Sequence, residues 1–257
     1  MSSIILCVTE GEKTEVKVLE RLQAEFLDQP IEIICFGTNI YQLYRKVKDE
    51  DIEFLTTYEI LQEISQERRG KRDDVLSQYS QIAIAEIYLF FDYDGHDNLA
   101  AKYPECIGKM LDIFNNETEN GKLYISYPMV EAFKHPIIKD EIYDISQGNT
   151  YKNYVSKICP EQLNKFINRP LNKKDWSNYF IEHMKAINLL VRNDFSYPSD
   201  YLHINESFTQ VGIYENQVAK YIKPKNHILV LTPFALFLIE YLGETLFEEW
   251  AQLALTA

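Results

Sequence analysis

The sequence predicts an α/β fold in which a parallel sheet is flanked by helices. Short apolar segments alternate with amphipathic helical segments through the first part of the chain, which is typical of such a sheet. The chain has 257 residues, enough to bury a sizeable core. Its 46% hydrophobic and 25% charged residues are typical of a globular protein and exclude a collagen-like or largely disordered chain.

Four short apolar segments are predicted as the strands of the sheet. The third of them is uniformly apolar, as expected for a strand that is covered on both faces. The strands are expected at residues 4–8, 31–36, 87–91 and 122–126.

The segments between these strands have the periodicity of helices. One buried face of a helix after the first strand is expected from the spacing of Val16, Leu19, Leu22 and Phe26. Further helices are expected at residues 40–47, 54–67 and 99–114, and residues 68–72 form a basic cluster that we interpret as a solvated turn.

The alternation of strands and helices fades after about residue 150. We therefore expect a sheet-containing domain over residues 1–150 and a mainly helical C-terminal region over residues 151–257. Helices are expected at residues 175–191 and 207–222, and an extra strand at 228–231. A final helix should run through Trp250, with Thr232 as its N-cap and Pro233 as its first residue.

The charge of the chain is strongly acidic and unevenly distributed. The formal net charge is −13, and residues 1–150 hold 28 acidic and 15 basic side chains against 11 of each in the rest. Free-standing, sequence-independent nucleic-acid binders gain affinity by neutralising phosphates with Lys and Arg, so this charge argues against that class. A local basic patch or a metal-mediated contact with nucleic acid stays open.

The four cysteines form no CxxC pair, which argues against a structural zinc or a disulfide scaffold. The N-terminus lacks the basic region and cleavage site of a signal peptide. The longest apolar stretch, residues 228–242, is shorter than the roughly 20 residues of a membrane span. We expect a soluble, cytoplasmic protein with no membrane partner.

Acidic residues follow three of the four predicted strands. Glu10 follows the first, Asp92 and Asp94 follow the third, and Glu131 comes shortly after the fourth. Ligands bind beyond the carboxyl ends of strands in open parallel sheets. Crowded carboxylates repel one another, and hard cations such as Mg²⁺ or Mn²⁺ relieve this repulsion. The acids therefore predict a metal site, although solvated loop acids are the alternative.

A Glu-Gly pair closing the first strand and an Asp-x-Asp closing a later strand resemble the Toprim fold. The strings Cys7–Glu15, Phe91–Asp94 and Ser126–Phe133 are most similar to the RloB and OLD-like Toprim proteins of bacterial phage defence. The resemblance covers roughly residues 4 to 135. It implies a divalent-metal-dependent nuclease that hydrolyses phosphodiester bonds in DNA or RNA.

The resemblance also implies roles for individual residues. Glu10 matches a metal ligand or general acid/base, Asp92 and Asp94 match metal-binding aspartates, and Glu131 matches an acid that completes a second metal site. We expect all four acids to lie in exposed loops at strand ends. Lys13 is a candidate for phosphate contact in the site, although a solvated lysine is the favoured interpretation. Two ions about 3.5 to 4 Å apart would span the in-line displacement at phosphorus.

The sequence contains no Walker loop, so the resemblance implies a separate ABC-type or AAA-type ATPase as partner. Nucleic acid is the expected substrate, and a homo-oligomer is left open. One rival function is a haloacid-dehalogenase-like phosphatase, although His96 stands where that family has Thr or Val. The other is a non-catalytic Toprim-fold sensor or scaffold.

Several other side chains have two interpretations. Residues 151–192 contain eight Lys or Arg with interleaved aromatic residues, which suits stacking on a nucleic-acid strand, but a helical lobe with its aromatic side chains in the core is the favoured interpretation. His96 is either a proton-transfer or outer-shell group or a surface residue. The extra acids, which are either site residues or plain surface charge, are Glu12, Glu15 and Asp97.

Overall fold

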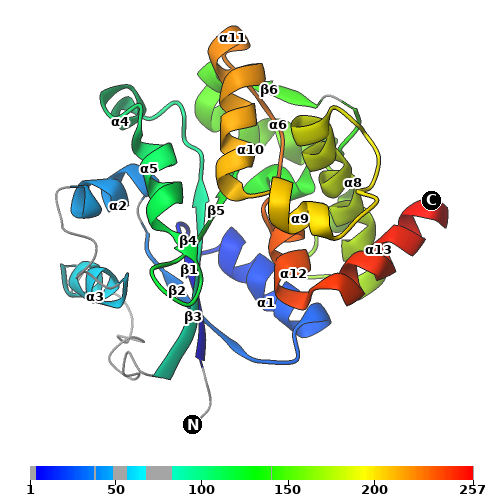
Figure 1. Ribbon diagram of the computed structural model, residues 1–257, viewed down its shortest axis with the longest axis horizontal. Helices are drawn as coiled ribbons and strands as arrows, with labels where there is room; N and C mark the ends of the chain where they lie inside the picture. Colours follow the sequence, from blue (N-terminus) through cyan, green and yellow to red (C-terminus); the bar gives the residue numbers. More distant parts are fainter. Residues whose placement is uncertain (1–3, 38, 49–56, 68–82, 140, 257) are drawn as a thin grey trace. The chain divides into compact units, whose positions relative to one another are not determined.

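The computed structural model describes residues 4–37, 39–48, 57–67, 83–139 and 141–256 (Figure 1). The chain forms two compact units. The first comprises Met1–Phe91 and Asn98–Tyr124, and the second comprises Asp92–Asp97 and Ile125–Ala257. The predicted boundary at residue 150 lies inside the second unit. The predicted basic turn at residues 68–72 lies outside the described residues.

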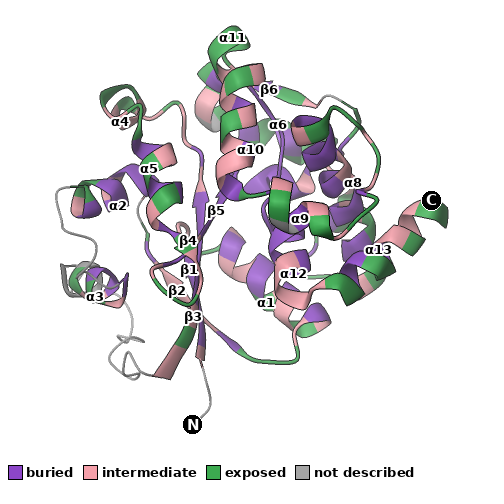
Figure 2. Ribbon diagram, in the orientation of Figure 1, coloured by how far each residue is buried: buried purple, intermediate pink, exposed green. Residues whose placement is uncertain are grey.

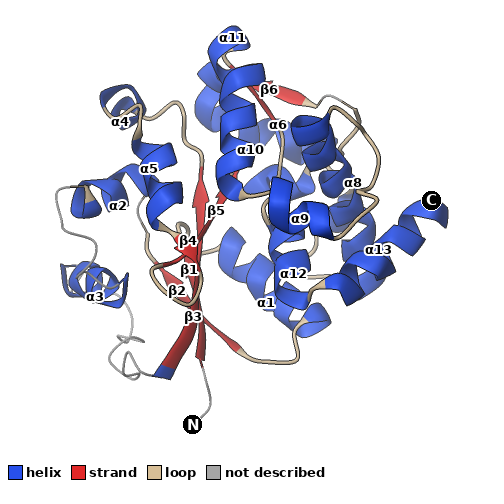
Figure 3. Ribbon diagram, in the orientation of Figure 1, coloured by secondary structure: helices blue, strands red, loops and turns tan. Residues whose placement is uncertain are grey.

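A five-stranded sheet has the order β2-β1-β3-β5-β4 (Figure 3). Strand β1 pairs in parallel with both β2 and β3, and β4 pairs antiparallel with β5. The α/β prediction is therefore confirmed, with a sheet that is mainly parallel. The bounds are β1 Ile4–Thr9, β2 Ile31–Cys35, β3 Ile84–Asp92, β4 Asn115–Asn116 and β5 Gly121–Ser126.

Helices cover the sheet, with α1 on one side and α2 and α5 on the other (Figure 1). One face of helix α1 is buried (Figure 2). Leu19, Leu22 and Phe26 lie on it as predicted, but Val18 takes the place of the predicted Val16, which is half-buried. The predicted helix over residues 99–114 is wrong in one respect, because it is two helices separated at Pro104. Proline lacks an N–H and clashes with the preceding turn. The bounds are α1 Thr14–Phe26, α2 Ile40–Val47, α3 Thr57–Glu67, α4 Asn98–Lys102 and α5 Cys106–Ile113.

The second unit is built from helices of 3 to 20 residues and a two-stranded antiparallel sheet of β6 and β7. The predicted strand at residues 228–231 is present as β7, in this separate sheet. The bounds are η3 Val130–Lys134, β6 Ile142–Asp144, η4 Ile145–Thr150, α6 Tyr151–Ile158, α7 Glu161–Asn164, α8 Lys173–Arg192, α9 Leu202–Ser207, α10 Gln210–Gln217, η5 Val218–Ile222, α11 Lys223–Lys225, β7 His227–Leu229, α12 Phe234–Leu242 and α13 Glu244–Thr256.

Two long predicted helices are each divided in the structure. Helix α10 starts after Thr209, whose Oγ1 accepts a hydrogen bond from the Gly212 N–H at 3.1 Å, so a cap interrupts the predicted helix 207–222. The final helix is split into α12 and α13 at Gly243, which has a φ of 74°. Its N-cap is Pro233 without a side-chain cap, so the predicted Thr232 cap is wrong.

Aromatic residues of α8 and of the segment that precedes it lie in the core of the second unit. Phe166, Trp176 and Phe180 are each 0% exposed, and the Trp176 and Phe180 rings stack with centroids 5.4 Å apart. The core interpretation is therefore confirmed for these three side chains, and they cannot stack on a nucleic acid. Tyr154, at 44% exposed, is accessible.

Among the helices that the structure describes, every one is too short or too polar to cross a lipid bilayer.

Candidate functional site

The turn between β1 and α1 is closed by its own side chains. Thr9 Oγ1 donates to the Gly11 carbonyl at 2.9 Å, and the Gly11 N–H donates to Glu15 Oε1 at 3.1 Å. A Cβ on Gly11 would lie 2.6 Å from Glu15 Oε2, so any other residue at this position would push the carboxylate aside. Glu15 is 6% exposed and fixes the start of α1, so the surface-charge interpretation is wrong for this residue.

The backbone of Glu10 is held at the edge of the sheet. Its N–H donates to the Phe90 carbonyl at 3.0 Å, and its own carbonyl accepts the Gly37 N–H at 2.9 Å. Its side chain is half-buried, whereas Glu12 and Lys13 are exposed. Lys13 is the N-cap of α1 but makes no side-chain capping bond, so its position is compatible with the solvated interpretation and with phosphate contact alike.

The loop that follows β3 presents the paired aspartates. Asp92 ends the strand half-buried, and the N–H of the buried Tyr93 donates to the Ser126 carbonyl at 3.0 Å. Asp94 has a φ of 45°, and its carbonyl accepts the Asp97 N–H at 2.9 Å. Left-handed backbone is uncommon outside glycine, although Asp and Asn tolerate it better than other residues. The turn therefore fixes the direction of the Asp94 side chain by a backbone conformation that few residues adopt.

The electrostatic surroundings of Asp94 disfavour its charged form. Burial raises the pKa of the Asp94 carboxyl, His96 lowers it by a smaller amount, and the neighbouring Asp97 raises it further. A bound cation would reverse both the burial effect and the repulsion by Asp97. His96 is exposed, and its ring packs on Gly148, where an added Cβ would lie 3.0 Å from His96 Cδ2.

Glu131 does not lie in an exposed loop, so that expectation is wrong for this residue. It belongs to the short helix η3, is 3% exposed, and has Lys152 Nζ 2.7 Å from its Oε1. The ammonium approaches at ion-pair distance, but the geometry is not that of a hydrogen bond. A buried carboxylate needs such a partner because desolvation of an unpaired charge is costly.

A second polar group near Glu131 was not predicted from the sequence. The buried His135 has its Nδ1 2.9 Å from the Tyr151 hydroxyl and its Nε2 3.2 Å from Glu141 Oε2. Burial lowers the pKa of His135, while the hydrogen bond and charge of Glu141 raise it. The partners lie 6 and 16 residues further along the chain, so no His pairing at helical spacing reveals them.

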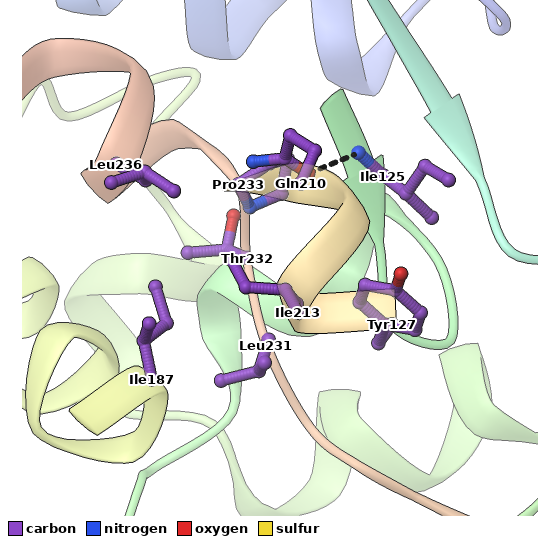
Figure 4. Close-up of a pocket in the computed structure, with 9 residues that line it drawn as sticks. All are labelled: Ile125, Tyr127, Ile187, Gln210, Ile213, Leu231, Thr232, Pro233 and Leu236. Atoms are coloured by element: carbon purple, nitrogen blue, oxygen red, sulfur yellow. Dashed lines mark hydrogen bonds between the residues drawn. The ribbon is translucent and has the colours of Figure 1, made fainter. Parts of the chain in front are cut away.

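The second unit also encloses a small cavity (Figure 4). Its volume is about 10 Å³, which is room for a single water molecule. Tyr127 and Thr232 line it, and their hydroxyl groups have no hydrogen-bond partner among the described residues. The cavity is too small for a substrate. It is lined by Ile125, Tyr127, Ile187, Gln210, Ile213, Leu231, Thr232, Pro233 and Leu236.

The carboxylates of the candidate site fit a hard divalent cation by donor chemistry. In the part of the chain that the structure describes, no three His, Cys, Asp or Glu side chains are grouped closely enough to hold a metal ion on their own. Mg²⁺ usually binds through one or two carboxylates, substrate phosphates and water rather than through a complete protein cage. Asp92 and Asp94 share one loop and can supply that minimum, whereas Glu131 is already paired with Lys152.

Glu10 belongs to the first unit and the other predicted site acids to the second. Strands β1 and β3 are adjacent and parallel, with Thr9 opposite Phe90, so both strands end at the same edge of the sheet. Convergence of the four carboxylates on one cleft stays a prediction.

Comparisons of this chain with family models, with curated proteins and with solved structures found no match.

Proposed function

We propose that this chain is a divalent-metal-dependent nuclease of the Toprim type that hydrolyses phosphodiester bonds in DNA or RNA. The observation that supports this proposal best is the loop after β3. There, Asp94 adopts a left-handed backbone, its carboxyl pKa is raised by burial and by Asp97, and Asp92 lies two residues away. Strain and crowded charge at the carboxyl end of a central strand are features that structures retain for a site rather than for stability.

The proposed mechanism assigns a task to each predicted residue. Asp92 and Asp94 hold Mg²⁺ or Mn²⁺, and Glu10 acts as a further ligand or takes up a proton at its carboxylate. Lys13 contacts a substrate phosphate from its exposed position at the start of α1. When bound, the cation supplies an activated water and neutralises charge on the phosphate. Glu131 joins the site only if its carboxylate leaves Lys152.

The proposal includes a biological setting that follows from the resemblance to RloB and OLD-like proteins. The chain would be the effector of a cytoplasmic phage-defence system and would depend on a separate ABC-type or AAA-type ATPase. A net charge of −13 supports this dependence, because a protein this acidic holds nucleic acid poorly without cations or a partner. The helical segments after residue 150 would then serve as the lobe that accompanies the Toprim domain.

One observation favours a second candidate, a non-catalytic sensor or scaffold that keeps the same fold. Glu131 is neutralised by Lys152 within the protein and so needs no metal. The phosphatase alternative has less support, because this chain has His96 at the position where that family has Thr or Val.

The test measures melting temperature and turnover on the same preparations. Because a ligand that binds only the folded state stabilises it, Mn²⁺ should raise the melting temperature of the wild type relative to EDTA. Asp92→Asn should show a smaller shift, and the exposed Asp112→Asn should match the wild type. Mn²⁺-dependent cleavage of single-stranded DNA, duplex DNA or RNA, lost in Asp92→Asn, would support the nuclease.

Each alternative has its own outcome in these assays. Turnover of p-nitrophenyl phosphate without nucleic-acid cleavage would favour the phosphatase. The scaffold would be favoured if Mn²⁺ raised the melting temperature of the wild type and of Asp92→Asn equally, and if no substrate were turned over in the presence of the partner ATPase.

A further inference from the structure

We infer that Lys152 is an internal counter-ion that occupies Glu131 and must be displaced before a divalent cation can use this carboxylate. This inference rests on the proposed function and specifies how the same site is regulated. It predicts that occupancy of the Glu131 position depends on competition between an ammonium group of the protein and the metal.

The two partners of this ion pair are built very differently. The Glu131 side chain is 4% exposed and fixed in η3, whereas the Lys152 side chain is 65% exposed and approaches from α6. A lysine ammonium on a long, flexible stem can return to water at little cost. The buried carboxylate has no such freedom and needs a cation at all times. Lys152 is therefore the side chain that moves into solvent when a metal ion binds, and Glu131 keeps its position.

A second lysine near Glu131 is held in place and does not replace Lys152. Lys134 Nζ lies 5.5 Å from the centre of the Phe133 ring and 5.6 Å from the centre of the Phe166 ring. These two cation–π contacts anchor its ammonium group within the fold. Lys134 can lower the cost of an ionised Glu131 from a distance, but Lys152 is the group in contact.

The position of Lys152 is set by its neighbour Tyr151. Tyr151 is 0% exposed, its hydroxyl bonds to His135 Nδ1 at 2.9 Å, and its ring meets the Tyr143 ring with centroids 4.7 Å apart. These contacts fix the first turn of α6 against η3. The packed backbone of α6 thus presents Lys152 to Glu131, while the Lys152 side chain itself stays 65% exposed to solvent.

The experiment compares Lys152→Gln with Lys157→Gln, which removes another exposed lysine of the same helix. Mn²⁺ affinity is measured by calorimetry on the full-length protein after EDTA treatment. We expect Lys152→Gln to bind Mn²⁺ about three- to tenfold more tightly than the wild type, because the competing ammonium is gone. Lys157→Gln should keep the wild-type affinity, and Lys152→Arg, which keeps the charge, should not gain affinity.

The ion pair itself is tested without metal. In EDTA, Lys152→Gln should melt below the wild type because it leaves Glu131 buried and unpaired, and Glu131→Gln combined with Lys152→Gln should recover most of that loss. Unchanged or weaker Mn²⁺ affinity in Lys152→Gln, while the wild type still binds Mn²⁺ and Asp92→Asn does not, would overturn the inference alone. No Mn²⁺ binding by the wild type would overturn the proposed function together with the inference.

Discussion

Asp94 combines an unusual backbone conformation with a charge that the fold disfavours. Substitution by Asn removes only the charge, whereas substitution by Ala also introduces a residue that does not tolerate this backbone conformation. Asn tolerates a φ of 45° nearly as well as Asp, whereas Ala does not. Because burial and Asp97 raise the pKa of Asp94, its ionised form at neutral pH is less favoured in the folded protein than in the unfolded chain. A neutral side chain of the same shape removes this penalty.

We therefore expect Asp94→Asn to melt above the wild type in EDTA at pH 7 and to lose the Mn²⁺-induced shift. Asp94→Ala should lose metal binding as well. Its free energy of unfolding should be about 1 to 2 kcal/mol lower than that of Asp94→Asn, because alanine adopts left-handed backbone at that cost. Differential scanning calorimetry with and without Mn²⁺ gives both quantities. A melting temperature of Asp94→Asn below that of the wild type in EDTA would mean that the charge stabilises the loop.

His183 provides a pH dependence that is independent of the candidate site. Burial, together with the nearby His135, lowers the pKa of His183 to about 3. Its Nδ1 accepts the Thr232 N–H at 3.3 Å, so the neutral ring is part of the fold. The unfolded chain binds the proton near the ordinary His pKa of about 6.5. Stability from this group is therefore complete above that value and falls as the pH decreases toward the folded pKa.

Between pH 7 and pH 4.5, His183 should reduce the free energy of unfolding by about 2 to 3 kcal/mol. Urea unfolding at both pH values measures this loss. The matched variant His183→Gln, which cannot take up a proton, should lose that much less over the same interval. If the wild type and His183→Gln lose stability equally, other groups are responsible for the acid sensitivity.

At the residue scale, the sequence predicted which acids follow the strands but not their surroundings. Asp92 and Asp94 could be found because a fully apolar strand precedes them. The bond from Gly11 to Glu15 depends on how the turn after β1 folds back on α1, and the pair of Glu131 with Lys152 joins residues far apart in the chain. No local pattern distinguishes these two buried acids from Glu12, which is exposed.

Strand β3 is the element on which the proposed loop depends. Phe91 is 1% exposed and meets the Phe36 ring edge-on with centroids 5.5 Å apart. We expect Phe91→Ala to lower the free energy of unfolding by roughly 3 to 5 kcal/mol, through lost burial and the cavity left behind. Chemical denaturation measures this change. Leu255→Ala, at a side chain that is 81% exposed, is the control and should change stability little.

Substitutions in β3 and in its loop should both lower activity, but for different reasons. Phe91→Ala should lose activity in proportion to unfolding, and lowering the temperature should restore part of it. Asp94→Asn should lose activity while staying folded. If Phe91→Ala unfolds no more readily than Leu255→Ala, the strand is not the rigid support that the proposed site requires.

At the scale of helices and strands, apolar periodicity predicted well which elements exist, but it predicted poorly where a helix is interrupted. Strands β1, β2, β3 and β5 follow from their apolar runs, but β4 consists of Asn115 and Asn116 and has no apolar pattern. The breaks at Pro104 and Gly243 were missed because the apolar spacing continues across them, although proline and glycine are the residues that interrupt helices. A helix prediction for this chain should give these breakers more weight than the periodicity.

For the whole molecule, the uneven distribution of charge decides how metal effects must be measured. The net charge of −13 arises in residues 1–150, so these residues repel one another at low ionic strength. Any cation then stabilises the fold by screening, and a divalent cation does so at lower concentration than Na⁺. A rise in melting temperature with Mn²⁺ alone does not prove a site.

Raising NaCl from about 0.05 M to about 0.5 M should therefore stabilise the wild type by about 1 kcal/mol, or roughly 2 to 4 °C in melting temperature. Asp92→Asn should respond to NaCl almost equally, because one charge among many changes general repulsion little. With screening saturated at the higher salt, about 1 mM Mn²⁺ adds almost nothing to ionic strength, so any further shift must come from binding. This further shift should appear in the wild type and be reduced in Asp92→Asn. If Mn²⁺ has no effect in high salt, its effect in low salt was screening, and the metal site proposed after β3 is absent.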